Sequence, residues 1–240
     1  MKRLLVFLLP ILALFLLTGC LYPSGNLAKN QVPNDVQLES VQDAVDRYVE
    51  KKQGLVPIFT KENDTPIFQK YIIDFTKLKQ ENVIANVPGN AFEYGGPYQY
   101  VLIYPEDDPT VKIIDLRITE KIRRIYNKIN VYRSEQIYPP FGEEVTKGVY
   151  KINKQLLGLE TDPFVVSPYS GKNLPIVMDV QGNLFVDYRM DLYEALNNFE
   201  HNLKEGDDIR YLLADNYPFV PAYSLPYTVK DGEPVFMLPE

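Results

Sequence analysis

The single histidine, His201, limits the catalytic chemistry that this chain can support. A nucleophilic mechanism of the Ser-His-Asp or Cys-His type needs a histidine base, so it would have to use this residue. The sequence has no Gly-x-Ser-x-Gly turn that would present a serine nucleophile. Next to Glu200, on the polar face of an expected helix, His201 has the setting of an exposed side chain. We therefore expect no histidine-dependent catalysis.

Carboxylate chemistry has equally little support in the sequence. Glycoside hydrolysis requires two carboxyl groups on opposite sides of a cleft. Adjacent residues do not face one another, and the acidic pairs of this chain are adjacent: Asp107-Asp108, Glu143-Glu144 and Asp207-Asp208. We expect these pairs in solvated loops and classify the protein as not an enzyme.

Metal and cofactor sites are not indicated either. One histidine and one cysteine cannot form a tetrahedral zinc site of His and Cys ligands within one chain. The acidic turns at 106–108 and 231–233 lack the alternating ligands and distal glutamate of a calcium loop. The sequence contains no phosphate-binding glycine loop or dinucleotide fingerprint. We expect no metal and no cofactor.

Tyrosine-rich and proline-rich segments are the first feature that suggests binding. They lie at 90–98, 138–141 and 217–223. A tyrosine combines a rigid apolar ring with a hydrogen-bonding tip, which suits peptide or glycan recognition. The candidate contact residues are Tyr94, Tyr98, Tyr217 and Tyr223. The alternative is that these rings fill the core and pack the turns.

A basic segment in an acidic protein is the second such feature. Residues 110–133 contain seven basic and two acidic residues, a local charge of +5. Lys121, Arg124 and Lys128 fall on one stripe of an expected helix. An anionic ligand or a partner's acidic patch could dock there. The alternative is a solvated helix face balanced by the acidic helices expected within 191–215.

The amino terminus has the pattern of an export signal. Lys2 and Arg3 precede an apolar stretch at 4–17, which is too short for a typical membrane span. The stretch ends in Leu17-Thr18-Gly19-Cys20, which resembles the lipobox of bacterial lipoproteins. This resemblance implies cleavage between Gly19 and Cys20, a lipid on the Cys20 thiol, and a location on the extracytoplasmic face of the cell membrane. The alternatives are an uncleaved anchor helix and a secretory peptide cut elsewhere.

Cleavage at Cys20 would leave an acidic chain without disulfides. It removes two of the 25 basic residues and leaves 23 against 32 acidic residues, a formal charge of −9. Such acidity argues against nucleic acid as a partner. Lipidation would use the only cysteine, so the apolar core must hold the fold without cross-links.

Hydrophobic periodicity predicts helices and β-hairpins without a regular strand-helix-strand alternation. Apolar residues recur with helical spacing at 36–53, 119–130 (with Thr119 as cap) and 191–204, and a short helix is expected at 209–214. Strand pairs are expected at 55–59 with 67–75, 98–104 with 111–118, 174–180 with 184–188, and 227–230 with 235–238.

This order of elements predicts an α+β fold with mainly antiparallel sheet and a few amphipathic helices. The chain divides into a signal peptide at 1–19, a lipidated cysteine and flexible tether at 20–35, and a globular domain at 36–240. Similar strand patterns at 66–75 and 175–188 suggest two related units joined near 138–142. Coincidence is the alternative explanation.

Besides the leader, the pattern at 89–96, Gly-Asn-Ala-Phe-Glu-Tyr-Gly-Gly, resembles the uncharacterised YphF-type lipoproteins of spore-forming bacilli. Members of that group are sometimes labelled transporter-associated binding proteins. We expect a membrane-anchored, non-enzymatic module that binds an envelope protein or wall polymer. The alternatives are a solute-binding lipoprotein of an ABC importer and a cell-wall hydrolase. The sequence leaves the number of associated copies open.

Overall fold

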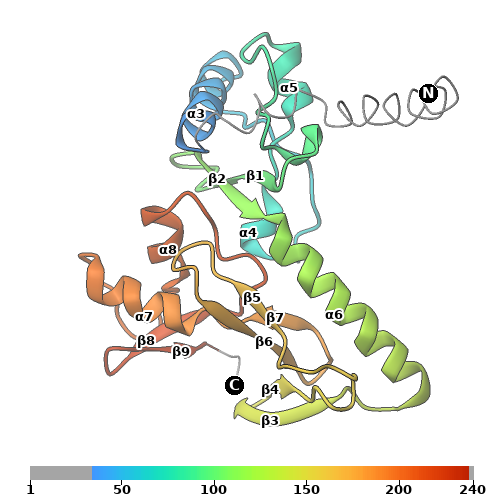
Figure 1. The fold of residues 1–240 in the computed structure, drawn as a ribbon. Helices are drawn as coiled ribbons and strands as arrows, with labels where there is room; N and C mark the ends of the chain where they lie inside the picture. Colours follow the sequence, from blue (N-terminus) through green and yellow to red (C-terminus); the bar gives the residue numbers. More distant parts are fainter. Residues whose placement is uncertain (1–33, 238–240) are drawn as a thin grey trace, which may run out of the picture.

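The computed structural model describes residues 34–237 and confirms the α+β class (Figure 1). An upper part holds α3, α4, α5 and the β1–β2 hairpin. A larger lower part holds the remaining strands with α7 and α8, and the long helix α6 runs from one part to the other. All paired strands in this region are antiparallel. The tether expected at 20–35 lies almost wholly outside the described residues.

The upper part is built around α3 (Asn34–Lys51), as its periodicity predicts. Val41, Ala44 and Val45 form its fully buried face. This face packs against the β1 (Tyr98–Ile103) and β2 (Thr110–Asp115) hairpin, whose inward residues include Tyr100 and Ile113. The acidic loop at 105–109 joins the two strands, so the prediction of this hairpin is confirmed.

The strand pair expected at 55–59 and 67–75 is largely wrong. The second segment instead forms two short helices, α4 (Ile67–Lys70) and α5 (Phe75–Gln80). Pro66 has a φ of −53° at the start of α4, and the Asp74 carboxylate accepts a hydrogen bond from the Thr76 N–H at 2.9 Å at the start of α5. Because helices begin at these positions, the expected strand pairing is reduced to a single β-bridge between Ile58 and Ile73.

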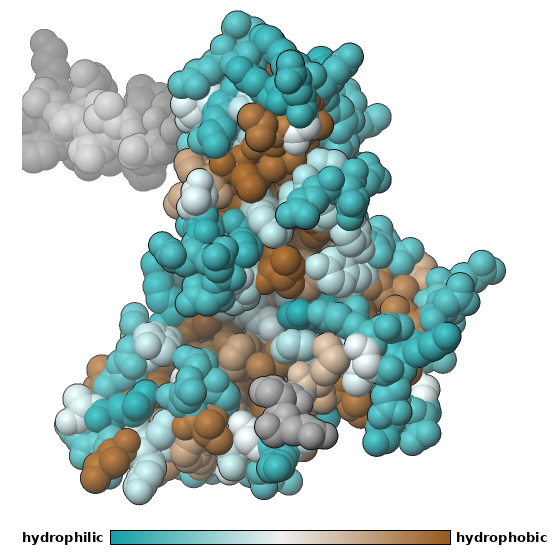
Figure 2. Space-filling view, turned by 180° about the vertical axis from the view of Figure 1, so that it is seen from behind, coloured by the Kyte–Doolittle hydropathy of each residue, from teal (hydrophilic) through white to brown (hydrophobic). Residues whose placement is uncertain are grey.

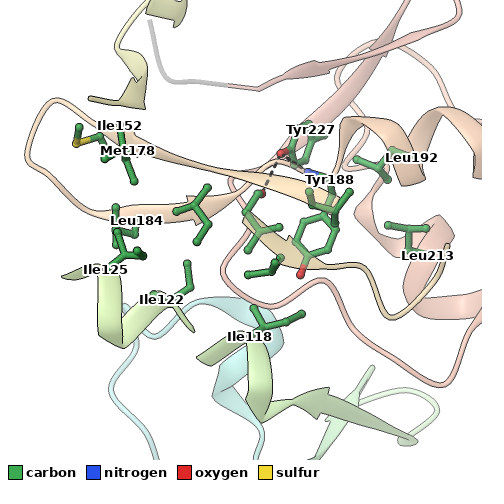
Figure 3. Close-up of a cluster of buried hydrophobic side chains, with 14 of the residues drawn as sticks. Ile118, Ile122, Ile125, Ile152, Met178, Leu184, Tyr188, Leu192, Leu213 and Tyr227 are labelled. Atoms are coloured by element: carbon green, nitrogen blue, oxygen red, sulfur yellow. Dashed lines mark hydrogen bonds between the residues drawn. The ribbon is translucent and has the colours of Figure 1, made fainter. Parts of the chain in front are cut away.

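Helix α6 (Leu116–Glu135) is longer than expected at both ends. Asp115 rather than Thr119 caps it, because its carboxylate accepts the Arg117 N–H at 2.9 Å. Its buried isoleucines, Ile118, Ile122, Ile125 and Ile129, enter the core of the lower part. Figure 3 shows Ile122 and Ile125 pointing toward Leu184 of the sheet. α6 therefore starts at the upper hairpin and packs on the lower sheet.

The lower sheet contains three strands that the sequence analysis missed. They are β3 (Phe141–Thr146), β4 (Val149–Ile152) and β5 (Phe164–Val166). The expected pair at 174–188 is confirmed as β6 (Asn173–Asp179) and β7 (Leu184–Val186). The strand order is β3-β4-β6-β5, and β7 also pairs with β6.

Two helices and a hairpin complete the lower part. They are α7 (Arg189–Asn198), α8 (Arg210–Asn216), and β8 (Tyr227–Lys230) paired with β9 (Glu233–Phe236). Tyr188 and Tyr227 meet in the core, where the Tyr227 hydroxyl accepts the Tyr188 N–H at 3.1 Å (Figure 3). α7 ends six residues earlier than predicted, so His201 lies in the following loop rather than on a helix face, which corrects that expectation.

The chain returns to the upper part after α8. Ile113 of β2 donates its N–H to Pro218 and accepts the N–H of Val220, at 2.9 and 3.1 Å. Figure 2 shows the narrower waist between the two parts, with hydrophobic atoms visible among a largely hydrophilic surface. Between residues 34 and 237, no helix has the length and hydropathy needed to cross a bilayer.

Candidate functional site

The start of α6 carries a fixed arginine at the junction of the two parts. The Asp115 carboxylate caps the helix and also accepts hydrogen bonds from the Arg117 guanidinium, whose Nε lies 2.8 Å from Oδ1. Asp115 is buried, whereas the Arg117 side chain is mostly exposed. This pairing raises the pKa of Arg117. The guanidinium is therefore held in one orientation while its outer surface stays accessible.

A pocket of about 570 Å³ lies on one side of this helix start. The 3-10 turn η1 (Phe92–Tyr94) and the following Gly95-Gly96-Pro97 form one wall. Arg117, Thr119, Glu120 and Arg123 of α6 line the other. Gly96 is required here, because a Cβ would lie 2.1 Å from the Asn90 carbonyl carbon. We call this space the η1 pocket.

A second pocket, of about 380 Å³, lies on the other side of the same turn. Arg117, Ile118 and Lys121 of α6 face Phe164, Val165 and Val166 of β5 across it. The Lys121 ammonium lies 5.5 Å from the centre of the Phe164 ring. We call this space the β5 pocket. Arg117 lines both pockets, so they meet at that side chain.

The expected basic stripe lies on α6, but its members have different surroundings. Lys121 lines the β5 pocket. Arg124 is exposed and forms an ion pair with Glu120 at 2.5 Å, one helical turn away. Lys128 is exposed farther along the helix. The structure thus adds Arg117 and Arg123 to the candidate surface, and only Lys121 of the predicted three lines a pocket there.

The four tyrosines proposed as contacts do not form one surface. Tyr94 is exposed at the end of η1, and the Lys79 ammonium lies 5.9 Å from its ring centre. Tyr98 is only 8% exposed and packs edge-on against Phe219. Tyr217 and Tyr223 are half-buried around the lower core. Their role in partner binding stays a prediction, with Tyr94 the most accessible of the four.

An Asp-x-Arg motif that sequence reasoning missed recurs at three helix starts. In each case the Asp carboxylate accepts the backbone N–H of the Arg two residues later and binds its guanidinium. The motifs are Asp115-Leu116-Arg117, Asp187-Tyr188-Arg189 and Asp208-Ile209-Arg210. An Asp two residues before an Arg at the start of an expected helix is the signal that could have identified them. Only the first of these arginines lines the two pockets.

A buried carboxylate supports the loop behind the β5 pocket. Asp191, 2% exposed, accepts hydrogen bonds from the Ser167 hydroxyl at 2.8 Å and the Ser170 hydroxyl at 2.6 Å. Burial raises the pKa of Asp191, and the two serine hydroxyls partly oppose that shift. Ser167 also lines the pocket, so this cluster fixes one of its walls.

Among the described residues, no metal centre is built at this surface. Within 34–237, no three His, Cys, Asp or Glu residues are grouped closely enough to hold a metal ion. His201 is exposed in its loop, with Nε2 3.2 Å from the Leu196 carbonyl oxygen. The site presents Arg117, Lys121 and Arg123 beside the Asp115 and Glu120 carboxylates and apolar walls, and its excess of positive charge can bind an anionic group.

Comparison with known proteins gives one family match. No curated protein and no solved structure shows significant similarity to the chain. The matched segment begins with α3 and ends at Asp115, so it contains the upper part up to the cap of α6. Residues 34–115, about a third of the sequence, match the YphF family N-terminal domain and are thus related to it.

Proposed function

We propose that this protein is a lipid-anchored, extracytoplasmic binding module that holds an anionic component of the cell envelope at the start of α6. The proposal combines two features of the chain. The leader ending in Cys20 supplies the location, and the η1 and β5 pockets supply the binding surface. The match to the YphF family supports a relation to YphF-type proteins but assigns no ligand.

The observation that carries the proposal is the set of three cations in the first two turns of α6. Arg117 lies between the pockets, Lys121 lines the β5 pocket, and Arg123 lines the η1 pocket. Among the described residues, Arg123 forms no salt bridge. Positive charge concentrated in an acidic protein can orient an anionic partner during encounter and define its position.

The apolar walls make this surface more than a solvated helix face. Phe92 is 59% exposed at the mouth of the η1 pocket, and Phe164 lies under Lys121 in the β5 pocket. Exposed aromatic side chains next to arginine are typical of interface centres. A ligand with both acidic and apolar groups would use both features.

The location follows from the resemblance of the leader to a lipobox. Lipid on Cys20 would place only residues 21–33 between the bilayer and the start of α3. Thirteen residues can span at most about 45 Å, so α3 would begin within that distance of the membrane. An importer-type solute-binding protein and a wall hydrolase stay alternatives.

Cell fractionation tests the proposed location, and binding measurements test the proposed binding surface. We expect Cys20→Ser to release the protein from the membrane fraction, because no other thiol can be lipidated. Full-length protein in detergent should bind linear polyphosphate, a simple polyanion, and Arg123→Glu should weaken that binding. Wild-type protein that shows no salt-sensitive polyanion binding would overturn the assignment of the surface.

A further inference from the structure

β5 is a short edge strand of the lower sheet and lies beside α6, with the β5 pocket between them. Another edge strand of this sheet, β3, has two register shifts and carries the exposed charges Glu143 and Glu144. Such irregularities and charges prevent unwanted strand pairing. β5 consists of Phe164, Val165 and Val166, without charge and without a register shift. The edge strands β3 and β5 are therefore differently protected.

The outer edge of β5 has unpaired backbone groups. Ile176 of β6 donates its N–H to the Pro163 carbonyl at 3.0 Å, and Ser167 donates to Lys172 at 2.8 Å. In an antiparallel ladder these bonded positions alternate, so Val165 also faces β6 while Phe164 and Val166 face outward. Among the described residues, β5 pairs with no other strand. Four groups, two N–H and two C=O, are thus available to a further strand.

This edge lies beside a basic pocket rather than in open solvent. Phe164 and Val166 line the β5 pocket opposite Arg117 and Lys121. Val166 is 56% exposed. Farther along the same face of α6 follow Arg124 and Lys128. A chain lying along β5 would therefore have positive charge along one side.

We propose that β5 accepts an extended acidic segment of a partner protein as an additional strand. The backbone of that segment would bond to Phe164 and Val166, and its acidic side chains would contact Lys121 and Arg117. Three residues of edge strand provide few hydrogen bonds, so the ionic contacts must supply part of the affinity. The inference rests on the proposed function and names its ligand class: a peptide rather than a wall polymer.

A short synthetic peptide tests the proposal with the full-length protein in detergent. The probe has seven residues of alternating glutamate and valine with blocked ends, and its binding is measured by calorimetry. We expect saturable, salt-sensitive binding. N-methylation of alternate residues keeps the charge but removes backbone donors, and it should weaken binding about tenfold, the equivalent of one or two net hydrogen bonds. A lysine-valine peptide should not bind.

Two variants at one position separate backbone pairing from side-chain contact. Val166→Pro removes an N–H that points away from β6, so the β5–β6 ladder can remain, whereas Val166→Ala keeps that N–H. We expect about a tenfold loss of peptide affinity for the proline variant, again one or two hydrogen bonds, and little change for the alanine variant. Equal affinities of the two variants, or of the methylated and unmethylated peptides, would overturn strand addition.

Linear polyphosphate distinguishes failure of this inference from failure of the proposed function. If the protein binds polyphosphate through Arg123 but does not bind the acidic peptide, the proposed anionic site stands and strand addition at β5 is wrong. A protein that binds neither probe would contradict both.

Discussion

The side-chain nitrogen of Lys112 donates a hydrogen bond to the Tyr217 carbonyl oxygen at 2.8 Å. Lys112 lies on β2 and is 7% exposed, and the same nitrogen also contacts the Asp215 carbonyl at 3.3 Å. These carbonyls lie at the end of α8, where orphan acceptors and the helix dipole favour a cation. Lys112 thus links the segment 34–115, which matches the YphF N-terminal domain, to the carboxyl end of α8.

Replacement of this lysine should destabilise the fold. Lys112→Met keeps most of the buried alkyl volume but leaves both carbonyls without their donor, which costs about 1–3 kcal/mol in the free energy of unfolding. Urea denaturation measures the change. Lys147→Met, on the exposed β3–β4 turn, is the matched control and should have little effect. Equal stability of the two variants would contradict the role of Lys112.

Asp191 should give the protein a distinctive pH dependence. Its pKa is raised by burial, so the folded state holds the proton more tightly than the unfolded state. Acidification from neutral pH toward the ordinary aspartate value of about 3.9 should therefore stabilise the protein through this group. Asp191→Asn should remove that contribution, as measured by urea denaturation at several pH values. Asp43→Asn, at an exposed position on α3, should leave the profile unchanged.

Much of the fold could be predicted because its longest elements have one periodic apolar face. The isoleucines of α6 and the buried face of α3 identified both helices. The turns at 105–109 and 231–232 marked two hairpins, and Asp231 and Gly232 both have the positive φ that the latter turn requires.

The missed elements lack such local signals. β3 has a bulged, half-exposed pattern with two adjacent glutamates, and β5 has only three residues, so neither alternates clearly. At 67–75 the apolar run indicates a strand, but Pro66 and Asp74 start helices within it. Here capping decides the local structure against hydrophobic pattern.

The candidate site was predictable only in part for a related reason. The excess of positive charge on α6 is visible in the sequence, and Lys121 was identified from it. The roles of Arg117 and Arg123 depend on which segments face them, namely η1 and β5, which are distant in the sequence. A single sequence does not reveal that proximity.

Charge reversal on α6 should affect binding without affecting folding. Arg123→Glu places a negative charge in the η1 pocket, and we expect a reduced association rate with polyphosphate at low salt. Lys147→Glu makes the same charge change away from both pockets and should bind like wild type. The triple reversal of Lys121, Arg124 and Lys128 should also slow association while unfolding remains nearly unchanged. Surface plasmon resonance at several salt concentrations measures these rates.

His201 should be dispensable. Its ring is exposed, and its hydrogen bonds connect only residues within its own loop and the end of α7. His201→Ala should therefore behave like wild type in a cellular assay in which deletion of the gene gives a phenotype. A loss of function with normal protein level would place a functional site at His201 and contradict the non-enzymatic assignment.

Site-specific photocrosslinking in cells tests the central claim most directly, because it asks whether the membrane-anchored protein holds a partner at the start of α6. The crosslinker is placed at Thr119 in the η1 pocket, at Val166 in the β5 pocket, and at Tyr193, exposed on α7, as control. We predict a shared adduct from the first two positions, absent from Tyr193 and reduced by Arg123→Glu. An adduct found equally at Tyr193, or found at Tyr193 alone, would contradict the account.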